Sequence, residues 1–190
     1  PEIFARTAKV LLPKDYLRLW LTGEHVSEMS DAAGTAWLDV EKRRWSPELL
    51  AATQLGEGHM PRLVEGTERS GTLRAEIAGR WGMGSSVTVA GGAGDNAASA
   101  CGAGTVRPGT AFVSLGTSGV LFASNGAYLP NPESAVHTFC HALPDTWHQM
   151  GVILSATDSL NWLAGITGSK AGDLKGELGE TQLAPGNVTF

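Results

Sequence analysis

The segment VTVAGGAGDNAASACGAG, residues 87–104, holds a single charged side chain, Asp95, among glycine, alanine and other small or apolar residues. The β-branched residues around 86–90 are typical of a buried strand. The alanine-rich part after Asp95 predicts a helix that can pack closely, and glycine lets a ligand or another backbone come near. The segment therefore predicts a strand, a glycine loop and a helix, with one carboxylate where the loop meets the helix.

Two roles are open for Asp95. Aspartate is a favoured N-cap and the helix dipole stabilises its charge, so Asp95 could cap a helix over residues 96–103. A carboxylate at a strand end, in an open glycine pocket, is also well placed to accept a proton from a substrate hydroxyl. The two roles are compatible, and one aspartate can fill both.

Residues 92–97 also fit the pattern G-x-G-x-x-A of a dinucleotide-binding turn, between a predicted strand and a predicted helix. That fingerprint needs an acidic residue about 20 positions later to bind the ribose. No Asp or Glu occurs between Asn96 and Pro132, and Asp95 would place a negative charge where the pyrophosphate binds. The sequence therefore disfavours a dinucleotide site.

A second glycine-bearing loop, SLGTSG, joins two predicted strands. Its backbone N–H groups, together with the hydroxyls of Thr117 and Ser118, can hold an anionic phosphate. An ordinary hairpin turn would use the same residues, so this loop alone does not decide between the two. Taken together, one loop offers a base, and the other offers hydrogen-bond donors for a phosphate.

The bulk composition narrows the class of protein. A chain of 190 residues suits one large domain or parts of two. Its net charge of -5 argues against broad binding to nucleic acid or to an anionic membrane, and no apolar run is long enough to span a membrane. Cys101 and Cys140 are expected to be buried thiols rather than a disulfide. We therefore expect a cytoplasmic protein without a nucleic-acid or membrane partner.

The rest of the chain predicts short helices and strands in alternation. They are two helical pieces within residues 2–22, the second starting at Pro13 and ended by Gly23; a short strand at 37–40; a helix capped by Ser46 over 47–54; a helix at 73–82; a strand hairpin at 110–124; a second hairpin at 135–155; and a helix at 156–167, after which the last twenty residues form a loop or linker.

Four residues, His137, Cys140, His141 and His148, invite interpretation as metal ligands. The four-residue spacing of His137 and His141 would suit a helix, but the alternation of residue types around them favours a strand. Zinc sites need three or four converging ligands. We therefore favour structural or hydrogen-bonding roles for these histidines.

The quoted motifs resemble the central segment of the FGGY family of carbohydrate kinases. GGAGDNAASACGAG followed by AFVSLGTSGVLFAS carries the resemblance. Three further segments are similar, in their residues and in their order, to family members that phosphorylate D-xylulose. They are LLPKDYLRLWLTGE, SEMSDAAGTAWLDVEKRRWS and PESAVHTFCHALPDTWHQMGVIL. The similarity runs from near Pro1 to about Gly168.

The resemblance implies an α/β fold of the actin-like ATPase (ribonuclease H-like) type. The chain would span the end of the first domain, residues 1–103, and the start of the second, residues 104–190. It implies transfer of the γ-phosphate of ATP, with Mg²⁺, to a hydroxyl of a ketopentose, D-xylulose, to give xylulose 5-phosphate. By matching motifs, Asp95 would be the catalytic base, Asn96 would contact the sugar, and the ATP phosphates would face Gly116, Thr117 and Ser118.

The chain departs from the family pattern in three places. The N-terminal D-x-G-T phosphate loop, the Met-His pair that contacts xylulose and the C-terminal glycine-rich adenosine loop do not occur in it. The resemblance therefore implies an internal fragment that is inactive alone. Uncovered sheet edges and apolar faces would favour self-association, so we expect a homo-oligomer. The alternatives are a family kinase for ribulose, glycerol or gluconate, and a non-catalytic self-associating fragment.

Two further expectations concern single residue types. Most of the tryptophans, among them Trp20, Trp37, Trp81 and Trp162, are expected to anchor the core, because aromatic side chains dominate burial. Asp31, in the sequence SDAAGT, could form a turn or could line the sugar side of the site. We favour the turn, because aspartate readily bonds its own backbone.

Overall fold

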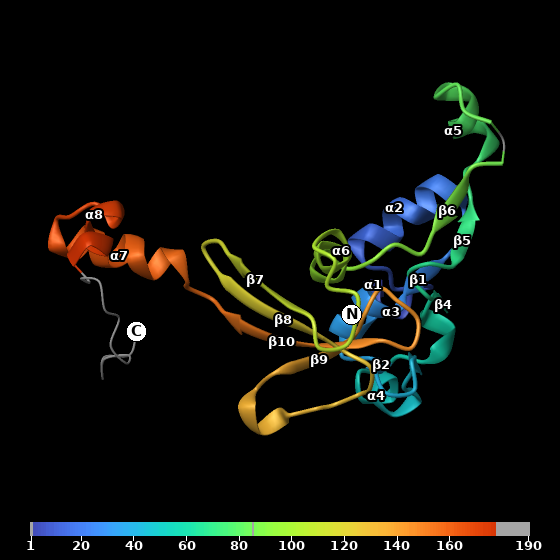
Figure 1. Cartoon of the computed structure of the whole chain (residues 1–190). Coiled ribbons are helices and arrows are strands. Elements are labelled where there is room, and N and C mark those ends of the chain that lie inside the picture. Colours follow the sequence, from blue (N-terminus) through green and yellow to red (C-terminus); the bar gives the residue numbers. More distant parts are fainter. Residues whose placement is uncertain (1, 85, 178–190) are drawn as a thin grey trace. The chain divides into compact units, whose positions relative to one another are not determined.

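The computed structural model describes residues 2–84 and 86–177 (Figure 1). Contacts divide the chain into two compact units. The first unit comprises Pro1–Phe112 and Phe122–Met150, and the second comprises Val113–Leu121 and Gly151–Phe190.

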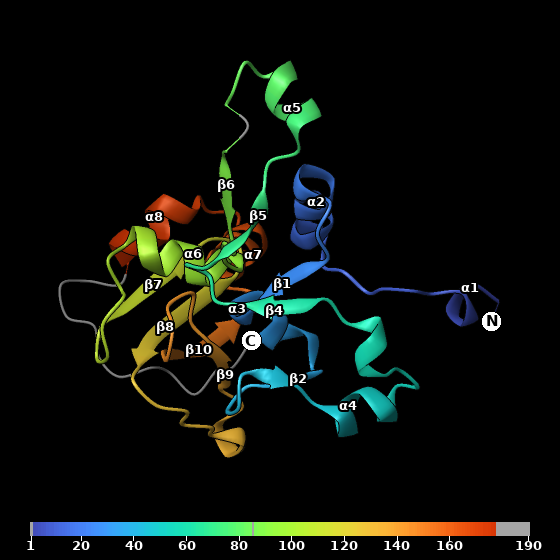
Figure 2. The same ribbon diagram turned by 90° about the vertical axis from the view of Figure 1, so that its right-hand side faces the viewer.

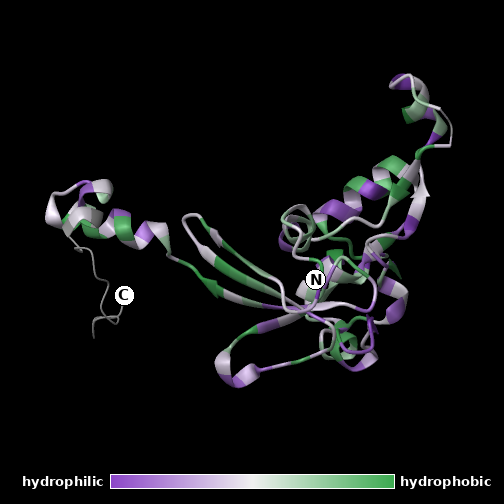
Figure 3. Ribbon diagram, viewed as in Figure 1, coloured by the Kyte–Doolittle hydropathy of each residue, from purple (hydrophilic) through white to green (hydrophobic). Residues whose placement is uncertain are grey.

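The N-terminal segment forms two helices as predicted, α1 (Glu2–Ala5) and α2 (Pro13–Thr22). Pro13 begins α2, where its missing N–H would have no partner within the helix. Gly23 ends α2 with a φ of 83°, and its N–H bonds to the carbonyl of Leu19. Hydrophobic and hydrophilic residues alternate around α2 (Figure 3).

The described strands form small sheets in which the pairs lie side by side (Figure 2). They are the parallel pair β1 (Val26–Glu28) and β4 (Arg62–Val64), the antiparallel pair β2 (Leu38–Asp39) and β3 (Arg44–Trp45), the antiparallel pair β5 (Arg69–Thr72) and β6 (Thr88–Ala90), and a four-stranded sheet with the order β7 (Ala111–Leu115), β8 (Gly119–Asn125), β10 (Trp147–Ile153) and β9 (His137–Cys140).

The remaining elements are short helices. They are α3 (Met29–Ala32), η1 (Ala33–Thr35), α4 (Pro47–Ala52), η2 (Glu57–His59), α5 (Ala75–Arg80), α6 (Asp95–Gly102), η3 (Pro132–Ser134), α7 (Thr157–Thr167) and α8 (Ala171–Glu177). Ser46 caps α4 as predicted, and its hydroxyl accepts the N–H of Leu49. Both predicted hairpins and the predicted helix at 156–167 are confirmed as β7–β8, β9–β10 and α7.

The core of the first unit joins its N-terminal part to the second hairpin. Met29 and Ala32 of α3 pack with Ala33, Leu38 and Cys140, all buried. Phe139 of β9 and Trp147 of β10 pack against this cluster. α3 therefore lies directly beside β9, although about a hundred residues of sequence separate them.

Some sequence predictions of burial and of secondary structure are wrong. The strand predicted as buried at 86–90 is β6, whose Thr88 and Ala90 are exposed, because it pairs with β5 in a sheet of only two strands. Cys101 is exposed, because it lies at the edge of the face of α6 that Ala97 and Ala100 bury. Cys140 is buried as predicted, and burial raises the pKa of its thiol to about 11.

The tryptophans are less buried than predicted. Trp20, Trp81 and Trp162 are 44%, 52% and 54% exposed, and Trp37 is half-buried. Trp20 and Trp81 lie 6.4 Å apart between ring centres, so they contact each other near the surface rather than in the core. The predicted loop at the C-terminus is also wrong in part, because residues 171–177 form α8; residues 178–190 lie outside the described residues.

The described helices do not include one that is long and apolar enough to cross a membrane.

One prediction follows from the glycines next to β6. A Cβ on Gly91 would lie 2.2 Å from the carbonyl oxygen of Glu65, so Gly91→Ala forces the backbone to move. We expect a loss of about 1–3 kcal/mol in the free energy of unfolding, as for other overpacked sites. The control is Gly79→Ala in α5, where a Cβ meets nothing within 4 Å; it should stabilise the helix by about 0.5–1 kcal/mol. Urea unfolding of both variants measures the two changes, and equal effects would contradict the packing argument.

Candidate active site

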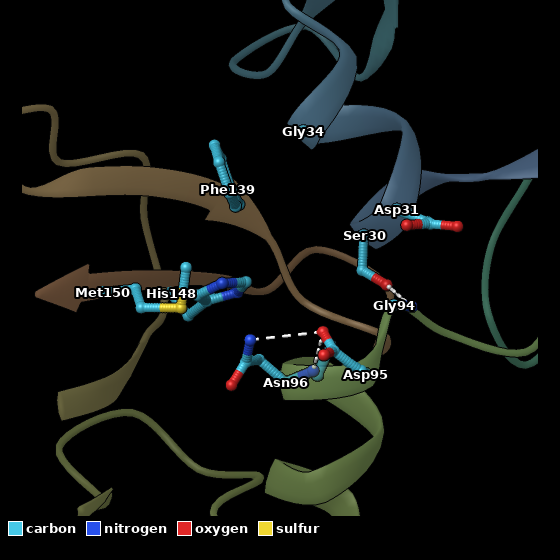
Figure 4. A pocket seen from close by; sticks show the side chains of 10 residues that line it. Ser30, Asp31, Gly34, Gly94, Asp95, Asn96, Phe139, His148 and Met150 are labelled. Carbon is cyan, nitrogen blue, oxygen red and sulfur yellow. Dashed lines mark hydrogen bonds between the residues drawn. The ribbon is translucent and has the colours of Figure 1, made fainter. Parts of the chain in front are cut away.

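A cavity of about 100 Å³ in the first unit brings together residues from three parts of the chain (Figure 4). One wall is α3 with η1, another is the start of α6, and the third is the β9–β10 hairpin. The residues that line the cavity include Ser30, Asp31, Asp95, Asn96, Phe139, His148 and Met150.

Asp95 and Asn96 lie where the glycine loop meets α6, as predicted. The N-cap prediction for Asp95 is wrong: α6 begins at Asp95, and Gly94 is the N-cap residue. Asp95 Oδ1 accepts the backbone N–H of Asn96 at 2.7 Å and the side-chain amide of Asn96 at 3.2 Å. Both bonds fall on one oxygen of an exposed side chain, so Oδ2 can accept a hydrogen bond from a ligand. The first turn of α6 still favours the negative charge.

Buried polar groups hold the loop that precedes Asp95. The hydroxyl of Ser30 accepts the N–H of Gly94 at 2.9 Å. Three groups donate to the fully buried carboxylate of Glu28: the N–H of Ser30 at 2.8 Å, the hydroxyl of Ser30 at 2.9 Å and the N–H of Asp31 at 2.9 Å. Burial raises the pKa of Glu28, against the opposing effect of Lys14.

A buried ion pair holds the other end of the same loop. Arg18 Nη1 bonds to Asp15 Oδ1 at 2.7 Å and to the carbonyl of Val26 at 2.8 Å. Its second terminal nitrogen, Nη2, donates to the carbonyl of Gly91. Both side chains are almost inaccessible to solvent, and such a charge is tolerated only when it is paired and hydrogen-bonded. The glycine loop is therefore tethered at Gly91 and at Gly94.

Asp31 lies in α3 and lines the cavity, so its interpretation as a turn residue is wrong. The backbone of α3 continues through Asp31, because Glu28 caps this short helix with its side chain. Lys14 Nζ lies 3.5 Å from Asp31 Oδ2 and 2.7 Å from Asp15 Oδ1. The lysine therefore offsets part of the negative charge beside the cavity.

The aromatic wall of the cavity is built on β10. His148 and Met150 alternate with half-buried residues, so both face the interior. The His148 ring stacks on Phe122 at 4.1 Å between centres and meets Phe139 edge-on at 5.8 Å. Burial, and secondarily the neighbouring His141, lowers the pKa of His148 to about 3. The imidazole therefore presents a neutral ring to the cavity.

The hydrogen-bonding role predicted for the histidines is confirmed for His141. Its Nε2 lies 3.1 Å from the carbonyl oxygen of Thr105, and the ring is fully buried. His137 is exposed at the start of β9. Within residues 2–84 and 86–177, three or more His, Cys, Asp or Glu side chains do not gather in a group that could hold a metal ion.

The second predicted loop forms a tight turn in the second unit. Gly116 N–H bonds to the carbonyl of Ser118 at 2.9 Å. The turn is fixed to the start of α7, because the hydroxyl of Thr157 donates to Gly116 O at 2.7 Å and Ala156 N–H donates to Thr117 O at 2.7 Å. The Ser118 hydroxyl donates to Leu154 O at 3.1 Å. The Thr117 side chain is exposed, so its hydroxyl is open to a ligand.

Sequence reasoning missed Glu28, Ser30, Phe139 and His148 as residues of the site. Glu28 stands directly before the short helix that it caps, which is a local signal for capping but not for a pocket. The contact from Ser30 to Gly94 spans 64 residues, and the hairpin residues approach from still farther along the chain.

The model of the FGGY family of carbohydrate kinases, N-terminal domain, matches residues 1–102, and the chain belongs to this family. It is 58% identical to the xylulose kinase of Escherichia coli (strain K12) over 168 residues, which are 88% of this chain and 34% of that protein. It is 55% identical to the xylulose kinase of Klebsiella pneumoniae over 87% of this chain and 34% of that protein. The chain therefore spans about a third of the length of these curated relatives.

Solved structures agree with this assignment. The crystal structure of a xyloylose kinase from Brucella ovis matches 99% of this chain and 39% of its own chain, with 71% identity and a TM-score of 0.92. A glycerol kinase from Plasmodium falciparum with ADP matches 88% of this chain and 35% of its own at 16% identity, with a TM-score of 0.77, which shows the fold alone. The predicted fold class is confirmed: the chain is an α/β segment of the actin-like ATPase fold of these kinases.

A prediction follows from the buried His148. Below a pH of about 6.5 the unfolded chain binds a proton at His148, whereas the folded chain keeps this ring neutral down to a pH of about 3. As the pH is lowered through this window, the free energy of unfolding should therefore decrease, by about 1.4 kcal/mol per pH unit for one proton. His148→Phe keeps an aromatic ring and removes this titration, so its stability should decline less steeply. Guanidinium unfolding between pH 7 and 4.5 measures the slopes.

The same exchange at the exposed His137 is the control for the His148 variant. If His148→Phe and His137→Phe change the slope equally, the buried ring is not the source of the pH dependence.

Proposed function

We propose that the intact protein is an ATP-dependent xylulose kinase, which transfers the γ-phosphate of ATP to a hydroxyl of D-xylulose to give xylulose 5-phosphate. The observation that carries the proposal is the 58% identity to the xylulose kinase of Escherichia coli across 88% of the chain. The cavity that holds Asp95 and Asn96 lies within this matching segment, and it supplies side chains suited to a polyhydroxylated ligand.

In this proposal Asp95 is the catalytic base. Its Oδ2 accepts the proton of the sugar hydroxyl while that oxygen attacks the γ-phosphorus, and the bond from the γ-phosphorus to the leaving oxygen of ADP breaks. The proton ends on the carboxylate and ADP carries away the electron pair. Phosphoryl transfer depends mainly on such positioning and on charge stabilisation.

Asn96 contacts the sugar in the same proposal. Its side-chain amide donates to Asp95 Oδ1 at 3.2 Å, which orients both groups and leaves its carbonyl oxygen to accept from a sugar hydroxyl. The neutral His148 ring and Met150 form the apolar side of the cavity, against which the carbon face of a sugar can rest.

The turn formed by Gly116, Thr117 and Ser118 faces the phosphates of ATP in this proposal. The exposed Thr117 hydroxyl can donate to a phosphate oxygen, whereas that of Ser118 would first have to leave Leu154. Mg²⁺ is proposed as the partner of the ATP phosphates. The described residues 2–84 and 86–177 lack a cluster of three acidic or other metal-binding side chains, so these residues alone do not supply a cage for the ion.

The remaining expectations are part of the same proposal. Sugar and ATP are the small-molecule partners, without nucleic acid or membrane; the protein is cytoplasmic and forms a homo-oligomer. Residues 1–103 end the first domain and residues 104–190 begin the second. A screen of D-xylulose against ribulose, glycerol and gluconate with the intact protein tests the sugar, and preference for one of the other three would replace xylulose in the proposal.

The first functional prediction concerns Asp95→Asn in the intact protein. Asparagine keeps the size of the side chain and an oxygen that can accept the bonds from Asn96, so the melting temperature should stay close to that of the wild type. Loss of the base should lower kcat by roughly 10²–10⁴-fold, the usual contribution of general-base catalysis. A coupled ADP-release assay with D-xylulose measures kcat.

The matched control for this variant is Asp173→Asn, an exposed aspartate in the first turn of α8. Its kcat should equal that of the wild type. Activity of Asp95→Asn within a few-fold of the wild type would remove Asp95 from the role of base.

The second functional prediction concerns Thr117→Val. The side chain is exposed, so stability should not change. Loss of a charge-assisted hydrogen bond to phosphate should cost about 1.5–3 kcal/mol, which is roughly a 10- to 150-fold drop in kcat/KM for ATP. The KM for the sugar should stay the same. An unchanged kcat/KM for ATP would show that Thr117 does not touch the nucleotide.

A further inference from the structure

The hydroxyl of Ser30 is used completely within the protein. Ser30 as a whole is 6% exposed. Its hydroxyl accepts the N–H of Gly94 at 2.9 Å and donates its own proton to Glu28 Oε2 at 2.9 Å. Two backbone N–H groups, those of Ser30 and Asp31, also donate to the Glu28 carboxylate, which therefore serves as an acceptor. Because the proton of Ser30 is committed to Glu28, a lone pair of its oxygen is directed at Gly94.

Gly94 is the last residue before Asp95, and both sides of it are fixed. Its N–H is held by Ser30, and its carbonyl accepts the first helical bond of α6, from Ala98 N–H at 2.9 Å. Gly94 has ordinary extended dihedral angles, with φ of -61° and ψ of 155°. The peptide that joins Gly94 to Asp95 therefore has little freedom left, and the position of Asp95 follows from the bond to Ser30 (Figure 4).

The start of the loop is anchored independently. Arg18 donates to the carbonyl of Gly91, and the N–H groups of Gly91 and Gly92 bond to the carbonyls of Glu68 and Gly66 at 2.8 and 2.9 Å. The Ser30 bond is the tether at the other end, next to the reacting carboxylate. Removing it leaves the beginning of the loop in place and frees the part that carries Asp95.

We propose that Ser30, oriented by the buried carboxylate of Glu28, is a positioning residue that holds Asp95 at the distance and angle proton transfer requires. The proposal rests on the function proposed above for Asp95. Displacement of a catalytic group by about 1 Å can cost about 10²-fold in rate. The hydrogen bond between Ser30 of α3 and Gly94 of the loop limits such displacement, because both partners have their other bonds satisfied within the fold.

The test uses Ser30→Ala in the intact protein, with two readouts. The kcat for phosphorylation of D-xylulose should fall by about 10- to 100-fold, in the range expected for a misplaced base. The KM for ATP should stay within a factor of about two, because the phosphate turn is tied to α7 by its own bonds. Exchange of the Gly94 amide hydrogen with solvent should become at least about tenfold faster, because its acceptor is gone. Ser99→Ala, an exposed serine on α6, is the matched control and should change none of these.

A second variant keeps the proposal testable if Ser30→Ala does not fold. Glu28→Gln preserves the size of the side chain but removes the charge that fixes the Ser30 proton, so kcat and Gly94 protection should change in the same direction by smaller factors. Ser30→Thr retains the hydroxyl and should restore Gly94 protection and most of kcat.

The outcomes separate this proposal from the one on which it rests. A folded Ser30→Ala protein with wild-type kcat, or with unchanged exchange at Gly94, would overturn the positioning role. So would a variant whose melting temperature falls while the kcat of its folded fraction does not. If the wild-type protein phosphorylates none of the tested sugars, the proposed function fails. In that case, faster exchange of the Gly94 amide in Ser30→Ala would still show that Ser30 holds the loop. Unchanged exchange would show that it does not.

Discussion

The structure of the site depends on one partly buried hydrogen bond, from the N–H of Gly94 to the hydroxyl of Ser30. This bond joins segments 64 residues apart and places the start of α6 against α3. It lies among groups that are costly to bury: the Glu28 carboxylate and the Asp15–Arg18 pair, each with hydrogen-bonding partners. Removing one hydrogen-bonding partner would leave another polar group buried without a bond, so these contacts stabilise each other. The loop between Gly91 and Gly94 therefore has one well-defined path.

α3 connects this polar network to the apolar core. Ser30 of α3 bonds to Gly94 of the glycine loop and to Glu28, the N-cap of α3, whereas Met29 and Ala32 pack with Cys140 beside β9. The same short segment therefore positions both walls of the cavity, Asp95 and Asn96 on α6 and His148 and Met150 on β10. A carboxylate open to solvent, next to a neutral aromatic ring, is suited to a ligand that has hydroxyl groups on an apolar carbon chain.

Local sequence signals predicted most helices and strands, but they did not predict contacts between residues far apart in the sequence. Gly23 after α2 and the Ser46–Pro47 pair before α4 mark helix ends by backbone chemistry that acts within a few residues. The same logic located Asp95 and Asn96, although it placed the cap one residue too late. The roles of Ser30 and His148 could not be predicted, because each depends on a partner that only folding brings near. Cys101 and Trp81 were predicted to be buried from residue type alone, but burial depends on which helix face has a neighbour.

We expect a sugar hydroxyl to meet Asp95 in the cavity between α3, α6 and β10. A crystal structure of the intact protein with D-xylulose and a non-hydrolysable ATP analogue tests it most directly. We expect a sugar hydroxyl within hydrogen-bond distance of Asp95 Oδ2, about 2.6–3.2 Å, with a second hydroxyl bonded to Asn96. We also expect Gly94 to keep its hydrogen bond to Ser30 in the complex. A sugar bound elsewhere, or bound in this cavity with Asp95 touching no hydroxyl, would rule out Asp95 as the base.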